Sequence, residues 1–159
     1  MTDLSPTQSL DSIHHSHDIE IVVTMRVDNQ LFGIPALQVQ DVLREQRMTT
    51  IPLTSPEIAG SINLRGRIVN LIDVRKRLSL SEPSSEKERI FVVVEHANEY
   101  YSLMVDDVGE AMPIDSAQIE KPPANLSGNW KEVSSGVCRL DGELLVIFDV
   151  KSFLNLTHV

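Results

Sequence analysis

The sequence predicts a mainly β protein made of two small antiparallel barrels, each of about five strands, packed side by side with short helices. Three observations lead to this prediction: the chain contains an internal repeat, both copies hold β-branched runs of strand length, and glycines stand where tight turns need them. The 159 residues are enough for one domain or two very small ones. Because 42% of the residues are hydrophobic but only 4% are aromatic, an aliphatic core is expected.

The second half of the chain repeats the first. Residues 21–34 resemble residues 90–103, with several apolar positions and one asparagine in register. Residues 60–78 resemble residues 136–154 without a gap, and each of these segments runs from a glycine to a leucine. A repeated unit of this size indicates two similar subdomains that pack together.

Each copy opens with a predicted hairpin. Residues 21–27 and 90–95 are β-branched runs of strand length. Short polar breaks follow at residues 28–30 and 97–99, and apolar residues resume after them. This pattern is typical of a tight turn between two antiparallel strands.

A second hairpin and a short helix complete each copy. The turns at residues 64–67 and 140–143 place glycine where the backbone needs a positive φ. The nearly continuous apolar runs that follow these turns indicate strands buried on both faces. Asp73 and Asp149 then stand where a helix begins, and a carboxylate there can cap the free N–H groups of the first turn.

The repeat divides the chain into two predicted barrels and a tail. Residues 1–18 are polar without sustained periodicity and are predicted to be a flexible N-terminal tail. Residues 19–156 are predicted to form one domain, with a first barrel at about residues 19–80 and a second at about 88–156. A polar stretch at residues 79–88 links the barrels, and an exchange of terminal elements between them is left open.

Charge and residue usage argue against several classes of function. The net charge of −9 and the scarcity of aromatic residues disfavour a nucleic-acid-binding barrel, although five cations lie between Arg65 and Arg77. The sequence shows no phosphate-binding loop, nucleophile–base pair or metal-ligand spacing, so we expect no enzyme, cofactor or metal. The single cysteine, Cys138, excludes an internal disulfide and is predicted to be a small buried thiol. With no signal pattern and no long apolar run, a cytoplasmic location is expected.

Five short motifs follow one another in a fixed order along the chain. They are Phe32-Gly33-Ile34, Val39-Gln40-Asp41-Val42, Ile51-Pro52, the run from Ile62 to Arg75 that begins Ile62-Asn63-Leu64-Arg65-Gly66, and Leu103-Met104-Val105-Asp106-Asp107-Val108. Together they resemble the CheW family of chemotaxis coupling proteins over about residues 19–156. The resemblance implies two five-stranded SH3-like barrels and a scaffold without enzymatic activity.

The resemblance also implies the partners. They are the CheW-like regulatory domain of the histidine kinase CheA and the cytoplasmic tip of a methyl-accepting chemoreceptor. Neither nucleic acid nor direct membrane insertion is expected. The output remains open between a flagellar pathway and a non-flagellar one that controls pili or development.

Particular residues are expected to face each partner. The resemblance implies that the receptor-facing groove contains Val39, Asp41, Val42, Arg65, Val105 and Val108, and that the kinase-facing surface of the first barrel contains Ala59 and Gly60. A helix-binding groove needs aliphatic side chains for contact area and charges for register. The repeat singles out Arg65, because the other copy carries the acidic Asp141 at the same turn position. Val39 and Val42 are equally compatible with core packing, since alternate residues of a strand point inward.

Overall fold

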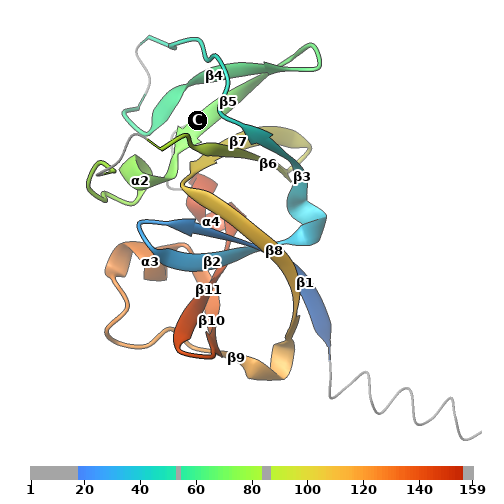
Figure 1. Cartoon of the computed structure of the whole chain (residues 1–159), viewed down its shortest axis with the longest axis vertical. Coiled ribbons are helices and arrows are strands. Elements are labelled where there is room, and N and C mark those ends of the chain that lie inside the picture. The colour runs from blue at the N-terminus through green and yellow to red at the C-terminus, as the bar shows by residue number, and fades with distance from the viewer. Residues whose placement is uncertain (1–17, 53–54, 84–86, 156–159) are drawn as a thin grey trace, which may run out of the picture.

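A computed structural model of the chain describes residues 18–52, 55–83 and 87–155. Two curved sheets dominate it, one above the other in Figure 1, and the predicted mainly β class is confirmed. The predicted tail falls on residues outside the described ranges, apart from Asp18.

The upper sheet in Figure 1 uses one continuous part of the chain, and we call it the continuous barrel. Its strands are β3 (Val39–Arg44), β4 (Ile58–Leu64), β5 (Arg67–Asp73), β6 (Ile90–His96) and β7 (Glu99–Val105). They pair in the order β3-β6-β7-β5-β4.

The lower sheet combines both ends of the described chain, and we call it the split barrel. Its strands are β1 (Ile19–Val27), β2 (Gln30–Pro35), β8 (Asp107–Asp115), β9 (Ile119–Glu120), β10 (Ser134–Leu140) and β11 (Glu143–Phe148). They pair in the order β8-β1-β2-β11-β10-β9.

The barrels therefore do not follow the predicted division at about residues 19–80 and 88–156. Each barrel takes its first hairpin from one copy of the repeat and its other strands from the other copy, so the exchange of elements that the sequence left open is present. The pairing also departs from purely antiparallel sheets. Strand β2 runs parallel to β11, where Phe32 pairs with Val146, and β5 runs parallel to β7, where Ile72 pairs with Leu103.

Each barrel closes because one edge strand continues across to the opposite edge. After β3 the chain reaches Thr49, which forms a bridge with Ser61 of β4. After β8 it passes through η2 (Ser116–Gln118) into β9, which pairs with β10. The predicted barrel shape thus arises from two bent edge strands, and closure leaves few unpaired backbone groups.

Three apolar clusters fill the described part of the molecule. One cluster lies inside the continuous barrel and includes Ile62 and Phe91. A second lies inside the split barrel and includes Val22 and Cys138, so the predicted burial of this cysteine is confirmed. The largest lies between the barrels and draws on strands of both. Burial on both faces explains the nearly continuous apolar runs of the sequence.

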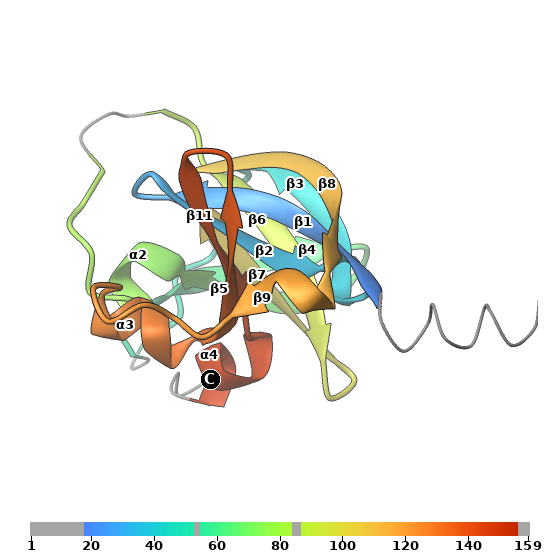
Figure 2. The ribbon, with the colours of Figure 1, turned by 90° about the horizontal axis from the view of Figure 1, so that it is seen from below.

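Short helices cover the cluster between the barrels. They are α2 (Val74–Arg77), α3 (Gly128–Glu132) and α4 (Val150–Asn155), and Figure 2 shows them on the same side of the two barrels. The predicted caps are confirmed: Asp73 Oδ1 accepts from the backbone N of Lys76 at 3.3 Å, and Asp149 Oδ1 accepts from that of Lys151 at 3.1 Å.

Candidate partner-binding surface

Two residues predicted to face the receptor form an ion pair with each other. Nη2 of Arg65 donates to Oδ2 of Asp41 at 2.9 Å. Asp41 lies on β3 and Arg65 in the turn between β4 and β5, so the pair joins the two edge strands of the continuous barrel. The Arg65 side chain stays 78% exposed, which leaves most of its guanidinium free to contact a partner.

The local sequence holds this pair in place. Arg65 has a φ of +52° and Gly66 a φ of +85°, as expected for a two-residue hairpin turn whose twist suits the flanking strands. Oδ1 of Asn63 accepts from the backbone N of Gly66 at 3.0 Å and braces the turn. Oδ1 of Asp41 accepts from the backbone N of Val42 at 2.9 Å, so the carboxylate is held from two sides.

The predicted receptor-facing valines occupy different environments. Val42 is 43% exposed beside Asp41. Val39 and Val108 are half-buried and pack against the cluster between the barrels. Val105 is fully buried in that cluster and offers no surface to a partner, so this residue of the predicted groove is corrected to a core position. Val108 lies on β8, whose residues are mostly exposed or half-buried, so it is more accessible than Val105.

The predicted kinase-facing residues lie on β4. Ala59 is half-buried and Gly60 is buried. A Cβ added to Gly60 would lie 2.5 Å from the carbonyl oxygen of Thr49, the residue that closes the barrel. Gly60 therefore makes room for the closing segment and has no side chain to present, so only the surface around it is available to a partner.

Sequence reasoning missed a set of exposed apolar side chains. Besides Val42, the exposed large hydrophobic residues among those that the structure describes are Ile19, Ile21, Leu37, Met48 and Ile68. Leu37 lies on η1 (Ala36–Gln38), which buries none of its residues. A single leucine between two strands gives no periodic signal, so its exposure emerges only from the structure.

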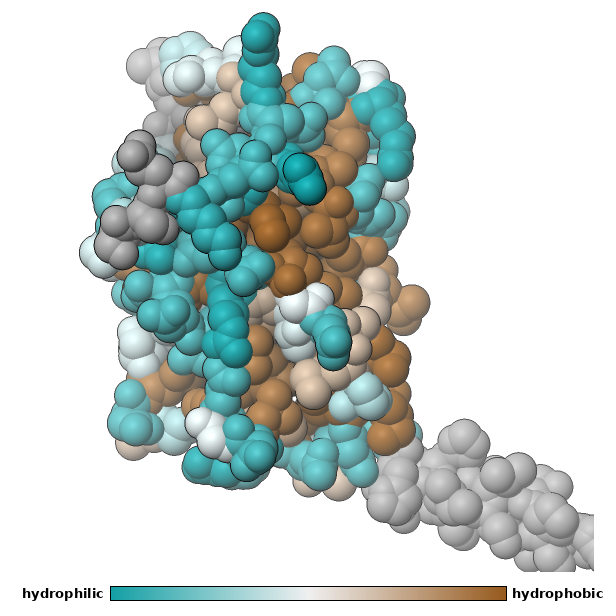
Figure 3. Space-filling view, viewed as in Figure 1, coloured by the Kyte–Doolittle hydropathy of each residue, from teal (hydrophilic) through white to brown (hydrophobic). Residues whose placement is uncertain are grey.

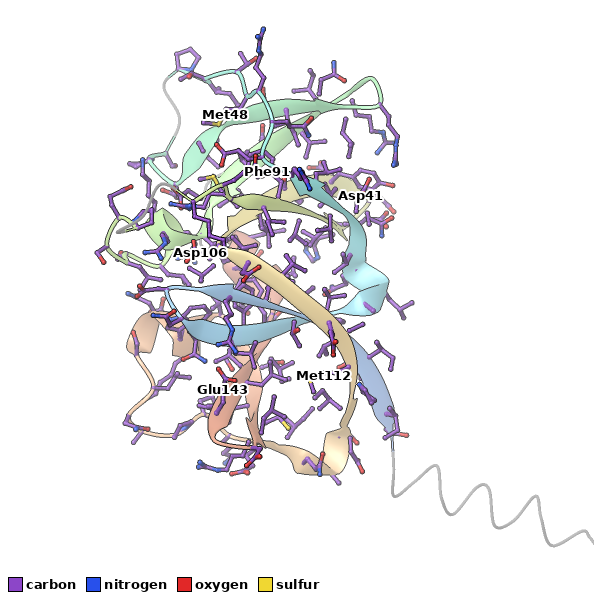
Figure 4. The ribbon with its side chains drawn as sticks, in the orientation of Figure 1. Asp41, Met48, Phe91, Asp106, Met112 and Glu143 are labelled. Atoms are coloured by element: carbon purple, nitrogen blue, oxygen red, sulfur yellow. The ribbon has the colours of Figure 1, made fainter. Side chains whose placement is uncertain are left out.

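A polar network joins the barrels away from the Asp41–Arg65 pair. Arg75 of α2 donates to Asp106 at 2.7 Å and lies 3.5 Å from Asp28 in the turn between β1 and β2. Nη1 of Arg89 lies 3.7 Å from Oδ1 of Asp106. Figure 4 shows Asp106 where the barrels meet and Asp41 on the other side of the continuous barrel.

The network is strongly ionised. Burial alone would raise the pKa of Asp106, but the hydrogen bond from Arg75 and the backbone N–H of Asp28 hold that pKa below its ordinary value. The hydrogen bond to Asp106 raises the pKa of Arg75 above its ordinary value, against the effect of burial. Within residues 18–52, 55–83 and 87–155, no three metal-ligating side chains gather and no helix is long and apolar enough to cross a membrane.

Fold and surface together define a class: a double-barrel β module that carries the Asp41–Arg65 ion pair on its outer surface. The CheW-like domain model matches residues 22–158, and the chain belongs to this family. The predicted family resemblance is therefore confirmed.

Individual relatives support the assignment. The chemotaxis protein CheW of Bacillus subtilis is 26% identical over 136 residues, which cover 86% of this chain and 87% of that protein. The crystal structure of the scaffolding protein TtCheW from Thermoanaerobacter tengcongensis superposes with a TM-score of 0.75 at 30% identity, over 83% of this chain and 90% of that one. The protein PilI of Pseudomonas aeruginosa is 30% identical over 64% of this chain and 58% of its own length.

Proposed function

We propose that this chain is a non-catalytic adaptor that couples methyl-accepting chemoreceptors to the histidine kinase CheA in a cytoplasmic signalling array. Membership of the CheW-like family and similarity to a scaffolding protein support the general role. The single structural observation that carries the proposal is the exposed Asp41–Arg65 pair beside Val42.

The receptor contact belongs on this pair and its neighbours. A helical receptor tip buries apolar side chains in a groove and sets its register with charges. Val42, with the half-buried Val39 and Val108, supplies aliphatic surface. Arg65 supplies a planar guanidinium that can pair with a carboxylate while its stem packs. Because Asp41 already pre-orients this guanidinium, less side-chain entropy is lost on binding.

The kinase contact belongs on the surface around Ala59 of β4. Gly60 supports this surface indirectly, because it lets the segment with Thr49 cross β4 closely. The neighbouring Met48 is exposed and adds apolar area on the same side, close to Gly60 in the structure. The regulatory domain of CheA is the partner that we assign to this surface.

A second candidate keeps the coupling role but differs in the pathway that the adaptor serves. Similarity to PilI favours an adaptor of a pilus-related chemosensory pathway, although that similarity covers less of the chain than the similarity to the CheW proteins. In that case the same two surfaces would serve a different receptor and kinase.

Reconstitution of kinase activity tests the proposal. Receptor-containing membranes and CheA are assayed for autophosphorylation with the wild-type chain, with no adaptor and with the Arg65→Asp variant. Aspartate tolerates the positive φ of this turn position, so the variant should fold. The matched control is Arg139→Asp, which reverses an exposed, ion-paired arginine of the split barrel. We expect receptor-stimulated activity with wild type and control, and little with Arg65→Asp.

Two results would contradict the proposal. Kinase activity that does not respond to the wild-type chain, with either a flagellar or a pilus-type set of partners, would refute the coupling role. Equal activity of Arg65→Asp and Arg139→Asp would leave the coupling role standing but remove Arg65 from the receptor contact.

A further inference from the structure

Each barrel has a fork where its two parallel strands begin, and the split barrel closes its own fork with a side chain. Strand β2 pairs with β11 only from Phe32 and Val146 onward. Before that point, Nε2 of Gln30 donates to the carbonyl oxygen of Leu144 at 3.0 Å and to that of Leu31 at 2.9 Å. The side-chain amide of Gln30 therefore ties the two diverging strands together.

The continuous barrel leaves the equivalent fork open. Its strands β5 and β7 pair only from Asn70 and Tyr101 onward, which is the same register. In the internal repeat, Glu99 takes the place of Gln30, and Ile68 takes the place of the leucine whose carbonyl oxygen accepts from that glutamine. An ionised carboxylate cannot donate a hydrogen bond to the carbonyl oxygen of Ile68. The opening persists as a hollow of about 610 Å³, and the residues that line it include Arg67, Ile68, Asn70, Asn98, Glu99 and Tyr101.

The carboxylate of Glu99 is held in place and stays available to a ligand. Its Oε2 accepts from the hydroxyl group of Tyr101 at 3.0 Å. Burial, and then this hydrogen bond, raise the pKa of Tyr101, so the hydroxyl group stays protonated at neutral pH. Arg67 is held over the ring of Tyr100, 4.6 Å from its centroid, and forms no ion pair with Glu99 among the described residues. In this part of the chain Oε1 of Glu99 has no hydrogen-bond donor either.

Ile68 adds an apolar contact to the polar fork. Its side chain is 72% exposed, whereas Leu144 at the equivalent position packs against the cluster between the barrels. Figure 1 shows the tips of the β4–β5 and β6–β7 hairpins on the same side of the continuous barrel, and residues of both hairpins line the hollow. Figure 3 shows hydrophobic surface elsewhere, along the lower right edge of the molecule, where β1 begins in Figure 1. The fork differs from that surface because it combines an apolar side chain with a carboxylate and a carbonyl oxygen.

We propose that this fork is a docking site for a lysine side chain of a partner protein, with an aliphatic residue beside that lysine packed on Ile68. The ammonium group donates to Oε1 of Glu99 and to the carbonyl oxygen of Ile68, in the place that the amide of Gln30 fills in the split barrel. A hydrogen bond between two ionised groups is stronger than one between neutral groups. Lysine suits the narrow opening because its charge is compact and lies at the end of a flexible stem. The net charge of −9 further favours a cationic partner segment.

A peptide titration followed by NMR tests the proposal. The probes are a tripeptide amide with lysine between two leucines, and an analogue with uncharged norleucine in place of the lysine. The full chain is isotopically labelled, and the shifts of the Ile68 methyl group and of the backbone amides of Glu99 and Tyr101 are measured. The test variant is Glu99→Gln, which recreates the amide that closes the split barrel. The matched control is Glu110→Gln, which removes the same charge from an exposed position of β8.

We expect saturable shifts with the lysine peptide in the wild type and the control, and binding weaker by about tenfold or more in Glu99→Gln. The norleucine peptide should give no saturable shifts. Equal binding of the two peptides would reduce the fork to an apolar contact at Ile68 and overturn the proposal. Unchanged affinity of Glu99→Gln, or no shift at the fork in the wild type, would overturn it as well. Because the assay contains neither receptor nor kinase, its result is independent of the coupling role.

Discussion

Gly60 and Gly136 occupy equivalent positions in the two barrels, and each leaves the space through which the barrel-closing segment passes. A Cβ on Gly60 would lie 2.5 Å from the carbonyl oxygen of Thr49, and a Cβ on Gly136 would lie 2.5 Å from Cγ2 of Ile119. The strand pairing shifts register beside both glycines, at Ile58/Gly60 and at Ser134/Gly136. The internal repeat thus preserves the residue type that barrel closure requires.

Substitution of these glycines should destabilise the fold in a definite order. Gly60→Ala forces a backbone oxygen to move, so we expect it to lower the free energy of unfolding by about 1–3 kcal/mol. Gly136→Ala meets Cγ2 of Ile119 at 2.5 Å and the carbonyl oxygen of Glu120 only at 3.1 Å, so the backbone is less crowded and the substitution should cost less. Gly128→Ala, where no atom lies within 4 Å of the added Cβ, is the control and should be neutral. Urea unfolding measures all three, and a Gly60→Ala protein as stable as Gly128→Ala would disprove the crowding argument.

The Asp41–Arg65 pair should affect binding far more than stability. Both groups lie at the surface, and exposed pairs contribute about 0–1 kcal/mol to folding. We therefore expect Asp41→Ala to unfold within about 1 kcal/mol of wild type, while binding to a receptor fragment weakens because Arg65 is no longer oriented. Calorimetric titration checks the binding. A large loss of stability with unchanged affinity would show that the pair supports the fold and does not contribute to receptor binding.

The Arg75 network should stabilise the junction between the barrels. Arg75 is buried and bonds to Asp106 and to the carbonyl oxygen of Ser81 at 2.7 Å. Arg75→Ala leaves a half-buried carboxylate without its main partner, and we expect a loss of about 2–3 kcal/mol in the free energy of unfolding. The comparison is Arg139→Ala, whose exposed pair with Glu120 should contribute less than about 1 kcal/mol. Similar losses for the two variants would show that the network has no special role.

Stability should fall in acid partly through Asp106. Its folded-state pKa is lowered, so its stabilising effect is fully present above the unfolded-state pKa, which is near 3.9 for aspartate. That effect is lost as the pH falls below this value toward the folded-state pKa, because in this range the unfolded protein takes up the proton more readily than the folded protein does. Unfolding measured between about pH 6 and pH 3 should show the difference between wild type and Asp106→Asn shrinking with acidification. A difference that stays constant would mean that Asp106 does not titrate in this way.

The single cysteine should react slowly while the protein is folded. Cys138 is buried on β10, and burial raises the pKa of its thiol above the ordinary value, with Glu120 adding to the shift. Because the thiolate is the reactive form, we expect slow modification by a disulfide reagent at neutral pH and fast modification in denaturant. Fast reaction of the native protein would indicate that β10 opens readily.

Much of the molecule is readable from local sequence patterns. The hairpin turns, the aspartate caps of α2 and α4 and the buried cysteine follow from residue types and spacing, since each depends on neighbours within a few positions. The repeat also identifies strands that occupy equivalent places in the two barrels, such as the β4–β5 and β10–β11 hairpins. Its motifs also led to the family, because the residues around the Arg65 turn keep a distinctive order.

The partners of each strand are not readable in this way, because a β-branched run pairs equally well with any complementary edge. Only the assembled chain shows that the β1–β2 hairpin pairs with β8 and β11 and completes the barrel of the other copy. The same non-local packing buries Val105, leaves Val42 exposed and brings Asp41 to Arg65 from opposite edges of one sheet. Sequence alone thus determined the strands, their turns and the family. The surface available to partners was decided only by the tertiary structure, because burial depends on contacts between residues far apart in the chain.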